Sequence, residues 1–153
     1  MPRLLVAVAV SLAAALSPAQ HVQAEPSEAA PRAGVLRVIV HNVAAAGGHV
    51  RVDVCTASEF LSKCRYSGSA AATPGVTMVE VRDLPPGVYA VQAYDDRNDN
   101  RRVDRNLIGL PTEAVGFSNN ASVRLDGPSF KAASFDFAGG EQTIALRLRR
   151  FLP

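Results

Sequence analysis

Apolar and polar residues alternate with a period of two over much of the chain, which is typical of half-buried β-strands. The alternation is most regular over residues 34–43 and 49–56. Arg51 and Asp53 fall on one face of the second segment, which we expect to point outward. The opposite faces of both segments are apolar and are expected to point into a core; they consist of Leu36, Val38, Val40, Val50, Val52 and Val54.

Further segments with strand character follow, and turn residues separate them. They cover residues 75–84, 87–94, 121–125, 132–137 and 142–150. Residues 67–74 read SGSAAATP and are expected to form a loose connector. About seven short strands without a long helix predict an all-β fold, a single antiparallel β-sandwich, with a small barrel as the alternative. The expected core includes Val38, Val52, Val54, Val91, Ile144 and Leu146.

The beginning of the chain has the features of a secretory signal peptide. Arg3 provides a positive charge, residues 4–16 form an apolar run, and small residues precede a cleavage point after Ala24 or, as the second choice, Ala19. As a helix the run spans only ~20 Å, too short for a ~30 Å hydrocarbon core. We therefore expect a signal peptide over 1–24, a flexible lead-in over 25–34 and the sandwich domain over 35–153, in the periplasm or secreted.

Cys55 and Cys64 are the only cysteines of the chain. In an exported protein such an isolated pair predicts a structural disulfide. A free redox pair or two metal ligands are the alternatives, but the C-x-x-C spacing is missing and His49 stands alone nearby. Thr56 and Glu59 have the spacing of a helix capping box, so we expect a short helical turn inside the closed loop.

Composition and charge exclude several classes of partner. Among the 153 residues, 48% are apolar and 20% charged, as in an ordinary globular domain. Without the leader, and therefore without Arg3, 15 basic residues face 14 acidic ones, which leaves a net charge of about +1. A net charge this small does not indicate a basic surface for nucleic acid, and it gives little attraction to anionic lipid. Tryptophan is absent, which argues against a sugar-stacking platform.

Residues 94–120 form a long stretch without periodicity, and such a stretch in a compact domain usually carries function. Counted from Asp96, side-chain oxygens occupy positions 1, 3, 5 and 9 of a calcium-loop pattern, supplied by Asp96, Asn98, Asn100 and Asp104. Arg101 replaces the usual glycine at position 6, and Leu107 the glutamate at position 12. Weakly bound calcium is therefore the only cofactor considered. The alternative is a loop held by Asp–Arg pairs without metal.

The sequence shows no constellation of catalytic residues. His41 and His49 flank the first turn, where surface or edge positions are usual. Ser118 lacks the surroundings of a nucleophile elbow, and a role in a capped turn is expected instead. Glu80 and Glu113 are isolated carboxylates, and no nucleotide-binding motif is present. The sequence therefore predicts no enzyme.

An ordered set of motifs runs through the chain. It comprises the segments PPGVYA (85–90), YDD (94–96), LIGLP (107–111), GFSNN (116–120) and PSF (128–130), together with the Asn98/Asn100/Asp104 spacing. With this set the chain resembles, from Leu36 to Leu148, a bacterial family of exported proteins known as domain of unknown function 2141. Members of the family typically have glycines where this chain has Asp99 and Arg101. The resemblance implies an immunoglobulin- or prealbumin-like sandwich and no particular activity.

These observations predict an exported, non-enzymatic binding or interaction module that presents the Asp/Asn/Arg-rich loop. The partner is expected to be a protein or a glycan, with no nucleic acid and no membrane span after signal cleavage. We expect a monomer. A carbohydrate-binding accessory domain is the first alternative, which Tyr94 and Phe117 near the loop keep open. A hydrolase is the second, and it would require Asp, His and Ser to converge in one pocket.

Overall fold

The computed structural model describes residues 32–122 and 126–151. The expected signal peptide and the lead-in up to residue 31 lie outside these ranges, as does part of the expected strand 121–125. The elements of the described chain are β1 (Gly34–Val43), β2 (His49–Cys55), β3 (Tyr66–Ala71), β4 (Gly75–Leu84), β5 (Gly87–Asp96), β6 (Val115–Phe117), the 3₁₀ turn η1 (Ser118–Asn120), α1 (Phe130–Ala133), β7 (Ser134–Phe137) and β8 (Glu141–Arg147).

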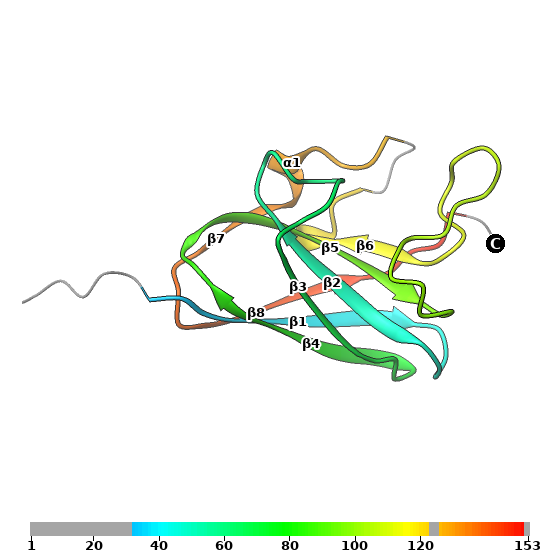
Figure 1. The fold of residues 1–153 in the computed structure, drawn as a ribbon, viewed down its shortest axis with the longest axis horizontal. Coiled ribbons are helices and arrows are strands. Elements are labelled where there is room, and N and C mark those ends of the chain that lie inside the picture. The colour runs from blue at the N-terminus through cyan, green and yellow to red at the C-terminus, as the bar shows by residue number, and fades with distance from the viewer. Residues whose placement is uncertain (1–31, 123–125, 152–153) are drawn as a thin grey trace, which may run out of the picture.

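Two β-sheets pack face to face, which confirms the predicted sandwich (Figure 1). One sheet has the strand order β4-β1-β8, and the other has the order β3-β2-β5-β6. Strand β7 also pairs with β5. It covers the first part of β5, from Gly87 to Ala90, and β6 covers a later part, from Gln92 to Tyr94. Within the described ranges no helix is long and apolar enough to cross a membrane.

One pairing departs from the expected antiparallel arrangement. Strand β8 runs parallel to β1, with Val38 opposite Ile144. The turn at Gly139–Gly140 does not make a hairpin, because β7 belongs to one sheet and β8 to the other. A chain that changes sheets is not constrained to return antiparallel to its neighbour.

The expected connector 67–74 is instead largely a strand. Strand β3 pairs with β2 along its whole length, from Tyr66 opposite Val54 to Ala71 opposite His49. Its Ser, Gly and Ala residues have low intrinsic β propensity, so the pairing partner determines this strand. The small residues are needed because Gly68 lies against β4, where an added Cβ would come within 2.3 Å of the Glu80 carbonyl oxygen.

Several predicted boundaries also change. Strand β5 continues to Asp96, two residues beyond the prediction, and the aperiodic stretch contains the short strand β6. The start of the segment 132–137 belongs to α1, whose N-cap Ser129 accepts a hydrogen bond from the Ala132 amide. Ala121 and Ser122 are not in a strand. The described chain therefore has eight strands rather than about seven.

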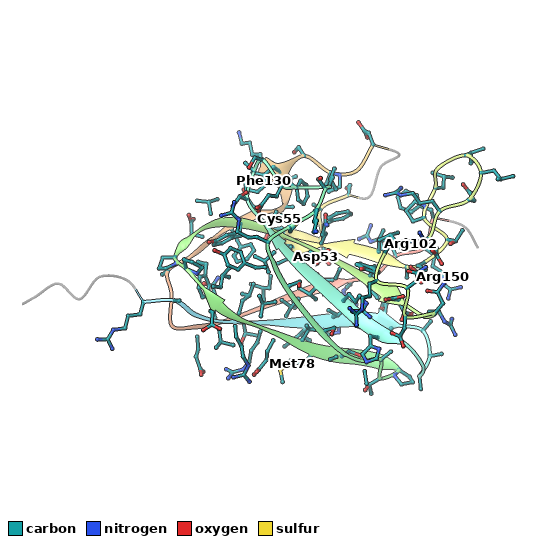
Figure 2. The ribbon with its side chains drawn as sticks, in the orientation of Figure 1. Asp53, Cys55, Met78, Arg102, Phe130 and Arg150 are labelled. Atoms are coloured by element: carbon teal, nitrogen blue, oxygen red, sulfur yellow. A yellow bond between two sulfur atoms is a disulfide. The ribbon has the colours of Figure 1, made fainter. Side chains whose placement is uncertain are left out.

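The core fills the space between the two sheets (Figure 2). The predicted inward residues of β1 and β2 are fully buried, which confirms the register read from the alternation. Val91 and Leu146 are also fully buried, whereas Ile144 is only partly buried and packs against the core. A second, smaller apolar cluster lies on the outer face of the larger sheet; its buried members are Ala90, Tyr94, Val115, Phe117 and Ala133.

Candidate functional site

A disulfide loop, residues 56–65, lies beside the outer face of the larger sheet. Cys55 and Cys64 are bonded, with Cα atoms 4.9 Å apart, which confirms the predicted pair. The Glu59 carboxylate accepts hydrogen bonds from the backbone amide and the hydroxyl of Thr56. The Phe60 amide donates to the Thr56 carbonyl, so the loop begins with the expected helical turn.

The long loop, residues 97–114, is anchored at its start by Asp96. This carboxylate is fully buried and accepts hydrogen bonds from the Arg51 guanidinium and from the amides of Asn100 and Arg101. Burial alone would raise the pKa of Asp96, but these hydrogen bonds outweigh it and hold the pKa below its usual range. Arg51 is therefore a partner of the loop and not the freely exposed residue that alternation alone implies.

Glu113 closes the long loop at its other end. Its carboxylate is buried and accepts hydrogen bonds from the Arg97 amide (3.1 Å) and the Asp104 amide (3.2 Å). Burial raises the pKa of Glu113. In the sequence Glu113 is an isolated carboxylate, and no role is expected for it. Its position between Pro111 and the apolar Ala114–Val115 could have indicated a buried glutamate, because an apolar surrounding is unusual for a solvated one.

The four predicted calcium ligands lie in this loop, and the loop's own N–H groups occupy their oxygens. Asp104 accepts from the side-chain amides of Asn98 (2.7 Å) and Asn100 (2.6 Å). The amide oxygens of Asn98 and Asn100 accept from the backbone at Asn100 and Arg102. Calcium would therefore require both amide groups to rotate so that their oxygens converge. In the described chain no three His, Cys, Asp or Glu residues are grouped to hold a metal. Calcium binding stays a prediction.

Asp99 and Arg101 have positive φ angles of 57° and 64°. These are the two positions at which the family pattern noted above has glycine. Residues with a Cβ are strained in this left-handed region, at a cost of roughly 1–2 kcal/mol each. The loop thus keeps the backbone shape that glycine would favour, although two charged side chains replace the glycines.

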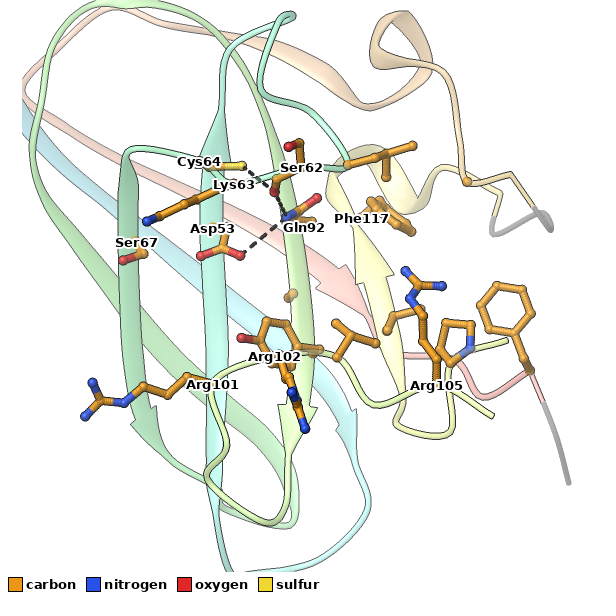
Figure 3. A pocket seen from close by; sticks show the side chains of 18 of the residues that line it. Asp53, Ser62, Lys63, Cys64, Ser67, Gln92, Arg101, Arg102, Arg105 and Phe117 are labelled. Atoms are coloured by element: carbon orange, nitrogen blue, oxygen red, sulfur yellow. Dashed lines mark hydrogen bonds between the residues drawn. The ribbon is translucent and has the colours of Figure 1, made fainter. Parts of the chain in front are cut away.

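Between the disulfide loop and the long loop lies a cavity of about 680 Å³, which we call the sheet groove (Figure 3). Asp53, Gln92 and Tyr94 from β2 and β5 form its floor. The disulfide loop contributes residues 61–64 to one side, and β6 and the long loop contribute the other. A smaller hollow over β3 shares Asp53, Ser67, Tyr94 and Arg101 with the groove and continues it along the sheet.

The groove combines basic side chains with an apolar wall. Its apolar lining includes the rings of Tyr94 and Phe117. Burial, followed by the charges of Asp53 and Asp96, raises the pKa of Tyr94 to about 12, so its hydroxyl stays protonated at neutral pH. Burial also raises the pKa of Asp53, which favours its neutral form. Four basic residues line the groove, against the acidic Asp53 and Asp126: Lys63, Arg101, Arg102 and Arg105.

The residues considered for catalysis lie elsewhere. Ser118 is buried, and its hydroxyl accepts from the Val91 amide and donates to the Ala133 carbonyl, so it has the structural role expected of it. His49 pairs with Asp99 at 2.5 Å, outside the groove. The groove contains Asp53, Ser62 and Ser67, but no histidine of the described chain lines it.

Comparison with known proteins agrees with the resemblance noted in the sequence. The model of the bacterial family domain of unknown function 2141, described as an uncharacterised protein conserved in bacteria, matches residues 38–145. No curated protein and no solved structure matches the chain significantly. The matched region runs from β1 into β8 and therefore includes both sheets, the disulfide loop and the long loop. The chain belongs to this bacterial family, domain of unknown function 2141.

Proposed function

We propose that this protein is an extracytoplasmic, non-catalytic binding module that holds its ligand in the sheet groove. The groove itself is the observation that carries the proposal, because a cavity of about 680 Å³ falls in the usual range for ligand sites. Its rim consists of two loops on a rigid sheet, which is the usual arrangement of recognition sites. The Cys55–Cys64 disulfide is consistent with an oxidising compartment.

The lining indicates the chemistry of the ligand. Lys63 and Arg101 have no ion-pair partner among the described residues, so they are available to anionic groups. The Tyr94 and Phe117 rings also line the groove, but each residue is only 7% exposed, so the rings contribute little open surface to a ligand. An acidic oligosaccharide meets the charge requirement, since its carboxylates would pair with these cations. The groove therefore favours a ligand with negative charge, and an acidic glycan is the ligand that we propose.

A titration followed by ¹⁵N-¹H NMR tests this proposal. The probes are trigalacturonate and a neutral trisaccharide of the same length. We expect trigalacturonate to shift amides of residues 61–64, 92–94, 101–103 and 105, which line the groove, and the neutral sugar to shift them less. Both sugars should be recovered intact by mass spectrometry.

Charge-matched variants locate the binding. Lys63→Gln with Arg101→Gln removes two positive charges from the groove and should weaken trigalacturonate binding at least about ten-fold. Arg82→Gln with Lys131→Gln removes the same charge from exposed positions on β4 and α1 and should leave binding unchanged. Shifts spread over the whole surface, or equal weakening in both variants, would refute a groove site. Cleavage of either sugar would instead favour the hydrolase.

A further inference from the structure

The tip of the long loop holds the two most exposed large apolar side chains of the described chain. Leu107 has a relative exposure of 107% and Ile108 of 79%. The other exposed large apolar residues, Leu61, Val76, Met78 and Val88, range from 46% to 53%. The loop protrudes from the end of the sandwich, so the tip has free space around it (Figure 1). Neither residue lines the sheet groove.

Hydrogen bonds brace this tip in its protruding shape. The Asn106 side-chain oxygen accepts from the amides of Ile108 (3.1 Å) and Leu110 (3.0 Å). The Asn106 amide donates to the Leu110 carbonyl, and the Gly109 amide to the Asn106 carbonyl. The Arg105 guanidinium donates to the Gly109 carbonyl at 2.8 Å. The apolar pair is therefore held outward and cannot fold back onto the sandwich without breaking this network.

Basic residues gather at the same end of the molecule. Arg105 contacts the tip itself, and Arg101 and Arg102 precede it in the same loop. The C-terminal segment joins them, because Arg149 pairs with Val115 at the base of the loop. Arg150 and Arg102 both lie at this end of the molecule (Figure 2). Within the described ranges, Arg102 is the one arginine of this group with an acidic partner, Asp104 at 3.8 Å. The long loop carries four arginines against Asp99, Asp104 and Glu113, so the positive charge at this end comes mainly from the added Arg149 and Arg150.

We propose that this tip docks on an anionic lipid surface, with Leu107 and Ile108 entering the headgroup region and the arginines contacting lipid phosphates. Aliphatic side chains flanked by basic residues are the usual elements of interfacial membrane binding. A protein partner fits less well, because a stable interface uses about 20–30 residues a side and the tip offers two apolar ones. Leu107 and Ile108 lie outside the sheet groove, whereas Arg101, Arg102 and Arg105 also line it, so a variant of the apolar pair tests the docking surface without changing the groove.

Flotation with lipid vesicles tests the proposal on the chain that lacks the signal sequence. The vesicles are pure phosphatidylcholine, or phosphatidylcholine with about 30% phosphatidylglycerol. We expect binding to the anionic vesicles only, weakened by added salt. Leu107→Ser with Ile108→Ser should lower the partition coefficient at least about ten-fold. The matched control, Val76→Ser with Met78→Ser, removes similar apolar residues from β4 and should bind as the wild type does.

Three outcomes would overturn the proposal. One is the absence of wild-type binding to anionic vesicles. Another is equal binding by the tip variant and the wild type, which would leave only unspecific charge attraction. The third is a concentration-dependent dimer without lipid that the tip variant abolishes, since the tip would then contact a second copy. Trigalacturonate binding by the tip variant should equal that of the wild type, so a failure here stays distinct from a failure of the proposed function.

Discussion

Replacing Asp96 by asparagine should destabilise the protein far more than the same change at Asp99. Both carboxylates contact Arg51, but Asp96 is fully buried whereas the Asp99 side chain is 47% exposed. Asparagine keeps one oxygen acceptor at position 96, loses the charge, and turns an NH₂ group toward N–H donors. Breaking a buried ion pair costs roughly 3–5 kcal/mol.

The lower end of that range applies, because Arg51 remains 18% exposed and regains some hydration. We therefore expect a loss of about 3 kcal/mol for Asp96→Asn, or roughly 10 °C in melting temperature. For Asp99→Asn we expect a loss of stability below about 1 kcal/mol, because exposed ion pairs contribute little.

The pH dependence follows from the lowered pKa of Asp96. A carboxyl whose pKa falls on folding stabilises the protein above its unfolded pKa of 3.8, and this stabilisation is lost as the pH falls through the folded value. Urea unfolding at pH 7 and pH 3, with EDTA to remove divalent cations, measures both parts. Asp96→Asn should lower the free energy of unfolding by the whole of the expected ~3 kcal/mol at pH 7 and by less at pH 3. Equal losses for the two variants at pH 7, or a difference that pH 3 leaves unchanged, would refute the reasoning.

Four further predictions concern the disulfide, the buried Asp95, the strained loop and calcium. Cys55→Ala with Cys64→Ala should lower the free energy of unfolding by about 2.7 kcal/mol, the chain-entropy value for this loop, and alkylation of the unreduced wild type should find no free thiol. Asp95 is 1% exposed and its carboxylate is poorly satisfied, with only the Ala44 backbone close enough in the described chain to hydrogen-bond it, so Asp95→Asn should stabilise by about 1–2 kcal/mol at pH 7. Because burial raises the pKa of Asp95, the contribution of Asp95 to stability is lost as the pH rises above 3.8, and the advantage of the variant should vanish near pH 3. Arg101→Gly should raise stability by up to about 1 kcal/mol because it relieves the positive φ, while Arg102→Gly should lower it, as unfolding curves would show. If calcium binds at ~10⁻⁴–10⁻³ M, millimolar calcium should raise the melting temperature beyond an ionic-strength control, and Asp104→Ala should abolish the rise.

The sequence by itself determined the parts of this protein that depend on neighbouring residues. Strands β1 and β4 begin and end where the alternation does, and Val50, Val52 and Val54 point inward because side chains of a strand alternate between its faces. The disulfide could be predicted because the chain contains only two cysteines. The ordered motifs were enough to indicate the family and its sandwich.

Only the tertiary structure decided which distant segments meet. Strands β3 and β6 carry weak local signals and form because β2 and β5 offer them edges, and β8 is parallel to β1 because the chain changes sheets before it. Arg51 and Asp96 lie 45 positions apart, so no local pattern pairs them. The groove likewise combines separate loops with strands of the larger sheet. Alternation reports which face of a strand is buried, whereas pairing partners and charge neighbours depend on how the whole chain packs.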